Sequence, residues 1–229
     1  MINRLFRNKL IFSVFFFTIL FFDIIVKLNT DDIAFRFFSK GIVMLSLIVF
    51  YIANQKEKTR KRYFLMLSAM ICFLAGDFFL IVYYVKAFFI IGLILFVLGK
   101  ILYALRFSNK QDFNLLRLMP FLLGCFVYMI ILMKLIINNL GDFFFPTLIY
   151  LFASMIVAQF AFLRKGEVNY KSYFLVIVGI LFGIVCDSLG VLQSFYYADI
   201  PFHKIMIMLF YGVSQFFIVT GILIEREKI

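Results

Sequence analysis

The sequence predicts an all-α polytopic membrane protein, a bundle of eight transmembrane helices with both termini in the cytoplasm. Of the 229 residues, 65% are hydrophobic and 15% are charged, against about 45–50% and about 25% in average soluble proteins. Phe accounts for 35 residues and Pro for 3. A soluble fold of this length does not bury so much apolar surface. The composition therefore excludes a soluble domain, a disordered chain and a disulfide scaffold.

Apolar runs of transmembrane length define the predicted helices, since a membrane-spanning helix needs about 20 mostly apolar residues. The first run follows Arg7 and Lys9 as in a signal peptide, but it lacks a small-x-small cleavage site, so we interpret it as a retained span. Short polar connections separate the runs, which predicts a single integral membrane domain over residues 1–229. The predicted helices span residues 10–26, 33–53, 63–85, 87–107, 118–137, 143–163, 173–195 and 203–224.

Lys and Arg are distributed unevenly between the two sides of this bundle. The side that holds both termini carries 16 of the 23 Lys and Arg residues, the opposite side carries 4, and Arg36, Lys40 and Lys100 lie inside helices. Such an excess in short connections marks the cytoplasmic side. Topology and anionic lipid explain the net charge of +11, which therefore gives no support for a nucleic-acid partner. The richness in Phe, Ile, Lys and Asn is typical of an AT-rich bacterial genome, which favours the plasma (inner) membrane.

The cysteines and the single histidine do not have the spacing of a metal site. Cys72, Cys125 and Cys186 fall in three different predicted helices without a CxxC pair, and His203 is the only histidine. Zinc and haem sites need ligands at short, characteristic spacings. We therefore expect packing roles for the cysteines, and neither a metal nor an organic cofactor.

Ionisable residues at the centre of a membrane helix cost about 2.5–3.5 kcal/mol each, so their presence indicates function. Asp23 lies one turn from Lys27 and is expected to pair with it near the membrane boundary. Anchoring near helix ends is expected for Asp23, Arg36, Lys86, Lys134 and Lys204. Four deeper groups are candidates for function: Lys40, Asp77, Lys100 and Asp187.

Asp77 and Asp187 are predicted to lie at the same depth in the membrane. Each follows the cytoplasmic start of its predicted helix by 14 residues, which is about 21 Å along a helix. At this depth, slightly beyond the bilayer centre, two carboxylates are able to face each other across a cavity. The long side chains of Lys40 and Lys100 are able to approach this pair.

Small and polar residues accompany these charged groups. Gly179, Gly183 and Asp187 follow one another at four-residue intervals, on a helical face that permits close approach of another helix. Four further polar residues are candidates for binding a substrate: Tyr103, Ser188, Tyr211 and Gln215. All of these groups, the two aspartates included, also fit an alternative role in hydrogen bonds that join helices.

In chain order these residues resemble the YhhN-type lysoplasmalogenase family, membrane proteins of bacteria and animals with eight predicted helices. The resemblance covers nearly the whole chain and lies on the second, third, fourth, seventh and eighth predicted helices. Each piece is common in membrane helices, but their order is fairly specific. The pieces are Ser39-Lys40, Gly76-Asp77 followed by Phe-Phe-Leu, Gly92 followed by Leu-Ile-Leu-Phe, Leu102-Tyr103 before Phe107, Gly183, Asp187-Ser188, and Tyr211 with Gln215.

Two positions depart from the family pattern. The family usually has Pro after the lysine of the second helix, where this chain has Gly41. It usually has His before the Leu-Leu-Tyr of the fourth helix, where this chain has Lys100. A lysine in place of an imidazole keeps a positive charge but changes proton transfer near neutral pH. This difference bears on the identity of the substrate more than on the fold.

The resemblance implies hydrolysis of the vinyl ether bond of lysoplasmalogens, lysophospholipids of the bilayer, to a fatty aldehyde and a glycerophospho-base. Protonation of the vinyl β-carbon gives an oxocarbenium ion, to which water adds. One aspartate would donate the proton and the other, ionised, would stabilise the cation and orient water, as paired carboxylates do in glycosidases. Catalysis then falls to Asp77 and Asp187, without a metal or cofactor. Substrate binding falls to Lys40, Lys100, Tyr103, Ser188, Tyr211 and Gln215.

Three alternatives remain open from the sequence. A transporter of a lipid or small molecule would also line its pathway with charges, although the Gly and Pro interruptions of discontinuous helices are sparse here. An intramembrane aspartyl protease also pairs aspartates, but Leu-Ala-Gly precedes Asp77 where that class has Gly-x-Gly. A noncatalytic assembly protein would use its charges only to join helices, and would retain its function with both aspartates replaced by Asn.

Overall fold

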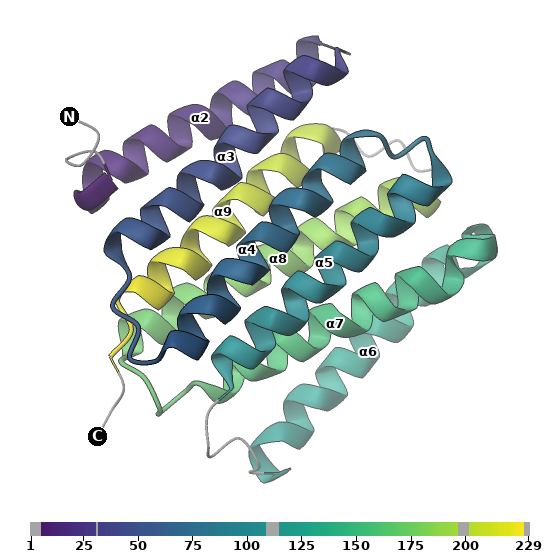
Figure 1. Ribbon diagram of the computed structural model, residues 1–229. Helices are drawn as coiled ribbons and strands as arrows, with labels where there is room; N and C mark the ends of the chain where they lie inside the picture. Colours follow the sequence, from purple (N-terminus) through teal and green to yellow (C-terminus); the bar gives the residue numbers. More distant parts are fainter. Residues whose placement is uncertain (1–5, 31, 109–114, 197–201, 227–229) are drawn as a thin grey trace. The chain divides into compact units, whose positions relative to one another are not determined.

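The computed structural model describes residues 6–30, 32–108, 115–196 and 202–226, with the backbone alone at 115–118. These residues contain no β-strand and form eight long α-helices, so the predicted all-α class is confirmed (Figure 1). The helices are α2 (Lys9–Asn29), α3 (Ile33–Asn54), α4 (Arg60–Ile81), α5 (Lys86–Phe107), α6 (Leu115–Leu140), α7 (Phe144–Leu163), α8 (Tyr170–Phe195) and α9 (His203–Leu223).

The helix ends agree with the predicted ends to within three residues, except at the end of α4. This helix begins at Arg60 because the Thr59 hydroxyl accepts a hydrogen bond from the Arg62 amide at 3.4 Å and caps the first turn. It ends at Ile81, four residues before the predicted end, because Val82 leaves the helical conformation with φ −101° and ψ 37°. The prediction from hydropathy extended the helix through this turn, because the residues of the turn are apolar or aromatic.

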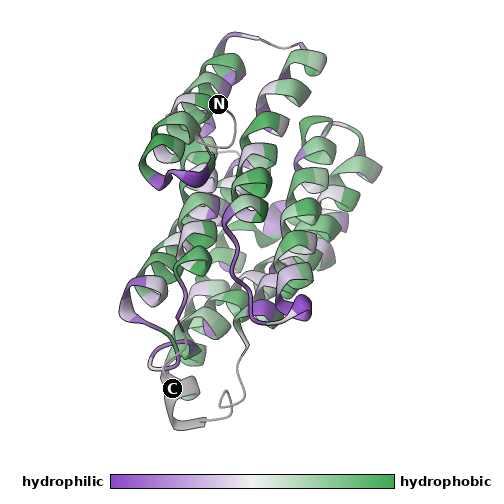
Figure 2. Cartoon of the chain, turned by 60° about the vertical axis from the view of Figure 1, so that its left-hand side comes forward, coloured by the Kyte–Doolittle hydropathy of each residue, from purple (hydrophilic) through white to green (hydrophobic). Residues whose placement is uncertain are grey.

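The described helices have the composition of membrane spans. Seven segments are long and apolar enough to cross a membrane, and one of them, Met119–Leu163, covers most of α6 and all of α7. Large apolar side chains cover the outer faces of the helices, such as Val14, Leu123 and Phe145 at 71%, 62% and 70% exposure. Hydrophilic residues gather in the connections between helices (Figure 2). A surface of this kind requires lipid as its solvent.

The chain divides into two compact units, residues 1–99 and 100–229, with the boundary inside α5. In unit 1, α3 packs against α2 and α4. The start of α5 approaches α4 closely at two glycines, because a Cβ on Gly92 would lie 3.5 Å from the backbone oxygen of Gly76. The predicted single domain over residues 1–229 stays a prediction.

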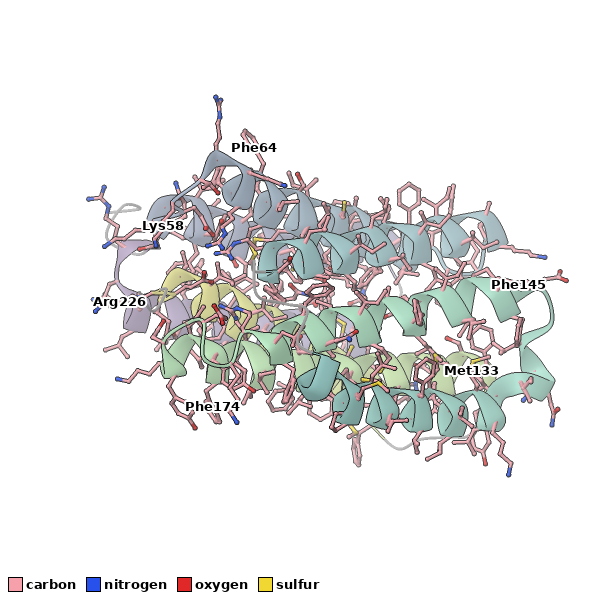
Figure 3. The ribbon with its side chains drawn as sticks, turned by 90° about the horizontal axis from the view of Figure 1, so that it is seen from below. Lys58, Phe64, Met133, Phe145, Phe174 and Arg226 are labelled. Carbon is pink, nitrogen blue, oxygen red and sulfur yellow. The ribbon has the colours of Figure 1, made fainter. Side chains whose placement is uncertain are left out.

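In unit 2, α8 packs most extensively against α9 and also contacts α6 and α7. A short 3-10 turn, Gly141–Phe143, joins α6 to α7, and Gly141 takes φ +47°, a conformation that glycine adopts without steric cost. Figure 3 shows Arg226 and Phe145 at opposite ends of this unit. The predicted close approach at Gly179 and Gly183 is confirmed, since a Cβ on either would lie 2.9 Å from an atom of Ser214 in α9.

Candidate functional site

A buried carboxylate organises the polar residues of unit 2. Asp187 of α8 accepts a hydrogen bond from the Lys100 ammonium of α5, with 2.6 Å between Nζ and Oδ2, and one from Ser154 Oγ of α7 at 2.8 Å. The hydroxyl of Tyr150, also in α7, donates to the other carboxylate oxygen, Oδ1. The side chains of Lys100 and Asp187 are only 9% and 10% exposed. Three helices therefore converge on one buried ion pair.

Helix α7 supplies two of these donors because Tyr150 and Ser154 are four residues apart and share one helical face. Ser154 Oγ also accepts a hydrogen bond from Lys100 Nζ at 2.6 Å, and the centre of the Tyr150 ring lies 3.6 Å from the same Nζ. The ammonium thus meets a carboxylate, a hydroxyl and an aromatic face, which together replace its water shell. We refer to Lys100, Tyr150, Ser154 and Asp187 as the Asp187 cluster.

The hydrogen bonds of Asp187 fit an ionised carboxylate. Its partners among the described residues are all donors, and the Lys100 ammonium supplies the balancing charge. A carboxylate has about four lone-pair positions. Oδ2 receives two donors and Oδ1 receives only the Tyr150 hydroxyl, so Oδ1 is able to accept one more hydrogen bond from a ligand or a water molecule.

Unit 1 contains a second buried ion pair. Lys40 Nζ of α3 lies 2.9 Å from Asp77 Oδ1 of α4, and the Asp77 side chain is 1% exposed. Gly76, directly before Asp77, admits the Phe96 ring of α5, which a Cβ would approach to 2.6 Å. The structure thus brings two of the predicted site residues together within this unit. Asp77 and Asp187 belong to different units, so their approach across a shared cavity stays a prediction.

Asp23 is buried, whereas a side chain that only anchors a helix end would be exposed. It is 1% exposed in α2, and the Ser39 hydroxyl of α3 donates to its Oδ1 at 2.7 Å. Ser39 directly precedes Lys40, so Asp23 fixes the α3 turn that carries this lysine. Helical spacing located Asp23 near Lys27 but contained no information on which residue of α3 would face it.

The remaining predicted polar residues fall into different environments. Tyr103 and Gln215 meet directly, because the phenol donates to Oε1 at 2.8 Å while both side chains are buried. Ser188 is adjacent to Asp187 in sequence but hydrogen-bonds Tyr128 of α6 and the carbonyl of Ile184. Tyr211 lies half-buried in α9, one turn before Gln215. Ser188 therefore joins helices, as the alternative interpretation of these groups expected.

The sequence analysis missed three residues that contact the predicted site: Tyr128, Tyr150 and Ser154. Tyr150 and Ser154 could have been found from the sequence, because they are two polar residues one turn apart in an apolar helix. The same pattern identified Tyr211 and Gln215. Tyr128 stands alone in α6, so its sequence context carried no comparable signal. Among the described residues, no group of three or more His, Cys, Asp or Glu is placed to hold a metal ion.

A second charged cluster lies where α5, α7 and α9 end. Arg106 Nη2 and Arg164 Nη2 lie 3.2 and 2.8 Å from the same oxygen, Oε2 of Glu225. Arg164 also donates to Ser172 Oγ at 3.0 Å, and both arginines are at most 3% exposed. Both arginines belong to the 16 Lys and Arg residues that the sequence analysis counted on the side that holds the termini. The structure shows both of them buried against a carboxylate, and the side of the membrane on which they lie stays a prediction.

Comparison with known proteins gives one finding about relationship. A family model described as the YhhN family matches residues 35–222. The matched segment includes Lys40 and Asp77 as well as the whole Asp187 cluster. No curated protein and no solved structure was found to match the chain.

Proposed function

Since the chain belongs to the YhhN family, we propose that it is a membrane-embedded hydrolase that cleaves the vinyl ether bond of lysoplasmalogens to a fatty aldehyde and a glycerophospho-base. The observation that carries the proposal is the Asp187 cluster, a carboxylate held by three donors inside a helical membrane protein. Ionisable groups at such depth are costly and are retained for function.

The reaction needs a proton donor and a carboxylate, and we assign these roles to different units. In unit 1, Asp77, which contacts Lys40, donates in its protonated form the proton that is added to the vinyl β-carbon. In unit 2, ionised Asp187 stabilises the oxocarbenium ion and accepts a proton from the water that attacks it, as an ionised carboxylate does in glycoside hydrolysis. The hemiacetal then releases aldehyde and alcohol. Tyr103, Gln215 and Tyr211 orient the substrate, and no metal takes part.

The hydrolase also requires a defined topology. We infer eight transmembrane helices, α2–α9, because the apolar segment that covers most of α6 and all of α7 is interrupted by the glycine turn at Gly141. An even number of spans places both termini on one side, and the excess of Lys and Arg on that side favours the cytoplasm. We expect the protein in the plasma (inner) membrane.

The direct test is aldehyde release by the purified, detergent-solubilised protein given a lysoplasmenyl lipid. Asp187→Asn and Asp77→Asn should each lose at least about 100-fold in kcat, since each removes a group that acts in the transition state. Asp32→Asn is the matched control, because Asp32 caps α3 from an exposed position and Asn caps equally well. Release by wild-type protein that persists in both aspartate variants would refute the assigned roles.

A transporter of a lipid or small molecule is the second candidate. Two separate Lys–Asp pairs inside membrane helices, Lys40–Asp77 and Lys100–Asp187, also suit a pathway whose charges exchange partners during transport. Proteoliposomes separate the two functions. If lysoplasmenyl lipid and ordinary lysophospholipid both remain uncleaved while a lipid crosses the bilayer, the protein is a transporter.

A further inference from the structure

Thr147 of α7 carries a buried hydroxyl that the protein itself does not satisfy. The residue is 1% exposed, and its Oγ1 has no hydrogen-bond partner within the part of the chain that the structure describes. Several hydroxyls in other helices donate to the carbonyl four residues earlier, as Thr18 does to Val14 at 2.9 Å and Ser188 to Ile184 at 2.6 Å, although Thr220 of α9 also has no hydrogen-bond partner among the described residues. The hydroxyl of Thr147 does not make this bond.

Thr147 lies close to the start of α7, which begins at Phe144. The carbonyl four residues before Thr147 belongs to Phe143, which precedes the helix and has φ −86° and ψ 3°, outside the α-helical conformation. A buried hydroxyl without a partner is unfavourable unless a water molecule or a ligand binds it.

Thr147 lies on the face of α7 that builds the Asp187 cluster. Thr147, Tyr150 and Ser154 occupy positions i, i+3 and i+7, which share one side of a helix. The latter two donate to Asp187, one to each carboxylate oxygen. Side chains of a helix lean toward its N-terminus, so the Tyr150 phenol, which binds Oδ1, reaches back toward the turn that holds Thr147. Oδ1 is also the oxygen with an open acceptor position.

We propose that Thr147 positions the water molecule that adds to the oxocarbenium ion. This inference rests on the proposed function. The water oxygen forms a bond to the cationic carbon, and one of its protons passes to Asp187, which later releases it to solvent, while the proton donor takes up a proton from solvent. The hemiacetal then breaks its bond to the glycerol oxygen, which receives the hydroxyl proton, and leaves as alcohol and aldehyde. Thr147 takes no proton and acts only by holding the water beside Oδ1.

Two substitutions separate this role from a structural one. Thr147→Val keeps the shape of the side chain and removes the hydroxyl, whereas Thr147→Ser keeps the hydroxyl and removes a methyl group. We expect Thr147→Val to lower kcat about 10- to 100-fold, with KM changed less than about twofold, because water is positioned after the substrate binds. Thr147→Ser should retain most of the activity. Thr18→Val, at an exposed threonine whose hydroxyl is satisfied by its own helix, should behave as wild type.

A product ratio gives a readout that altered folding does not change. In buffer that contains methanol, the oxocarbenium ion partitions between water, which gives aldehyde, and methanol, which gives a stable methyl acetal of the lipid. Loss of the positioned water should raise the ratio of acetal to aldehyde in Thr147→Val. The melting temperature of Thr147→Val should not fall, since the removed hydroxyl makes no bond within the described protein.

The outcomes are distinguishable. If the wild-type protein releases aldehyde and Thr147→Val matches it in kcat and product ratio, the role of Thr147 is refuted while the proposed function stands. The same conclusion follows if Thr147→Ser loses as much activity as Thr147→Val. If the wild-type protein releases no aldehyde, the proposed function fails, and the role of Thr147 fails with it.

Discussion

The charges of Lys100 and Asp187 compensate each other in the buried site. The effect of this pair on protein stability can therefore be measured separately from its effect on catalysis. Removing one member of a buried ion pair leaves an uncompensated charge, which costs about 3–5 kcal/mol, whereas replacing both with apolar residues is often neutral. A structural role and a catalytic role of the pair therefore predict different stability and activity for the single and double variants. Only a catalytic role requires the charged pair itself.

Lys100→Met should destabilise the protein by about 3 kcal/mol or more, because Asp187 loses its counter-charge. The double variant Lys100→Met with Asp187→Leu should recover most of this stability and still release no aldehyde. Unfolding in detergent and aldehyde release measure the two properties. The control is Lys134→Met, the same substitution at an exposed position of α6. Recovered activity in the double variant would assign the pair a purely structural role.

The sequence identified the charged residues of the candidate site but missed Tyr150 and Ser154, the uncharged members of the Asp187 cluster, for a physical reason. Lysine and aspartate are rare inside membrane helices, so Lys40, Asp77 and Asp187 were evident from hydropathy. Tyrosine and serine are ordinary in such helices and become informative only when a partner is known. Which residue becomes the partner of a polar side chain depends on how each helix is rotated about its own axis. A single sequence determines this rotation poorly.

At the scale of helices, α8 uses its glycines on one side and its carboxylate on another. Gly179 and Gly183 face Ser214 of α9, whereas Asp187 contacts α5 and α7. The sequence analysis placed all three residues on one face. Each step of four residues advances about 40° around a helix with 3.6 residues per turn, so two steps turn Asp187 away from α9. The same drift allows one helix to pack tightly and contribute to the site.

Alanine substitution of the α8 glycines should have opposite effects at two positions. A Cβ on Gly179 would lie 2.9 Å from the backbone oxygen of Ser214 and 3.0 Å from the backbone nitrogen of Ile218, so α9 must move. We expect Gly179→Ala to lose about 1–3 kcal/mol of stability. At Gly190 nothing lies within 4 Å of a Cβ, and alanine should add about 0.5–1 kcal/mol. Thermal unfolding in detergent compares the variants, and equal shifts would contradict the close packing of α8 and α9.

The ends of α5, α7 and α9 are joined by Glu225, which receives both Arg106 and Arg164. Glu225→Gln would leave two buried guanidinium groups without their carboxylate, and should destabilise the protein by about 3–5 kcal/mol. Glu167→Gln, in the connection between α7 and α8, is the matched control. The measurement is the concentration of a denaturing detergent, or the temperature, at which the helical circular dichroism signal is lost. A Glu225→Gln variant as stable as the control would show that the cluster does not hold these helix ends together.

At the scale of the whole molecule, composition and the spacing of apolar runs were sufficient for the fold class and for most helix ends. Charge distribution was less direct, because two of the counted residues, Arg106 and Arg164, are buried against Glu225 and do not face water. Removing both from the larger group still leaves a strong excess over the 4 Lys on the opposite side. The arrangement of the two units could not be derived, since hydropathy reports which residues contact lipid and not which helices are neighbours.

The number of spans decides on which side each connection lies, and this gives a direct test. With eight spans, Lys58 between α3 and α4 and Glu167 between α7 and α8 are cytoplasmic, and Asp142 between α6 and α7 is external. In a chain whose Cys72, Cys125 and Cys186 are replaced by Ser, Asp142→Cys should react with a membrane-impermeant maleimide in intact cells. Lys58→Cys and Glu167→Cys should react only after permeabilisation. If Met119–Leu163 crossed the membrane once, Glu167→Cys would react in intact cells, because every connection after that segment would change sides.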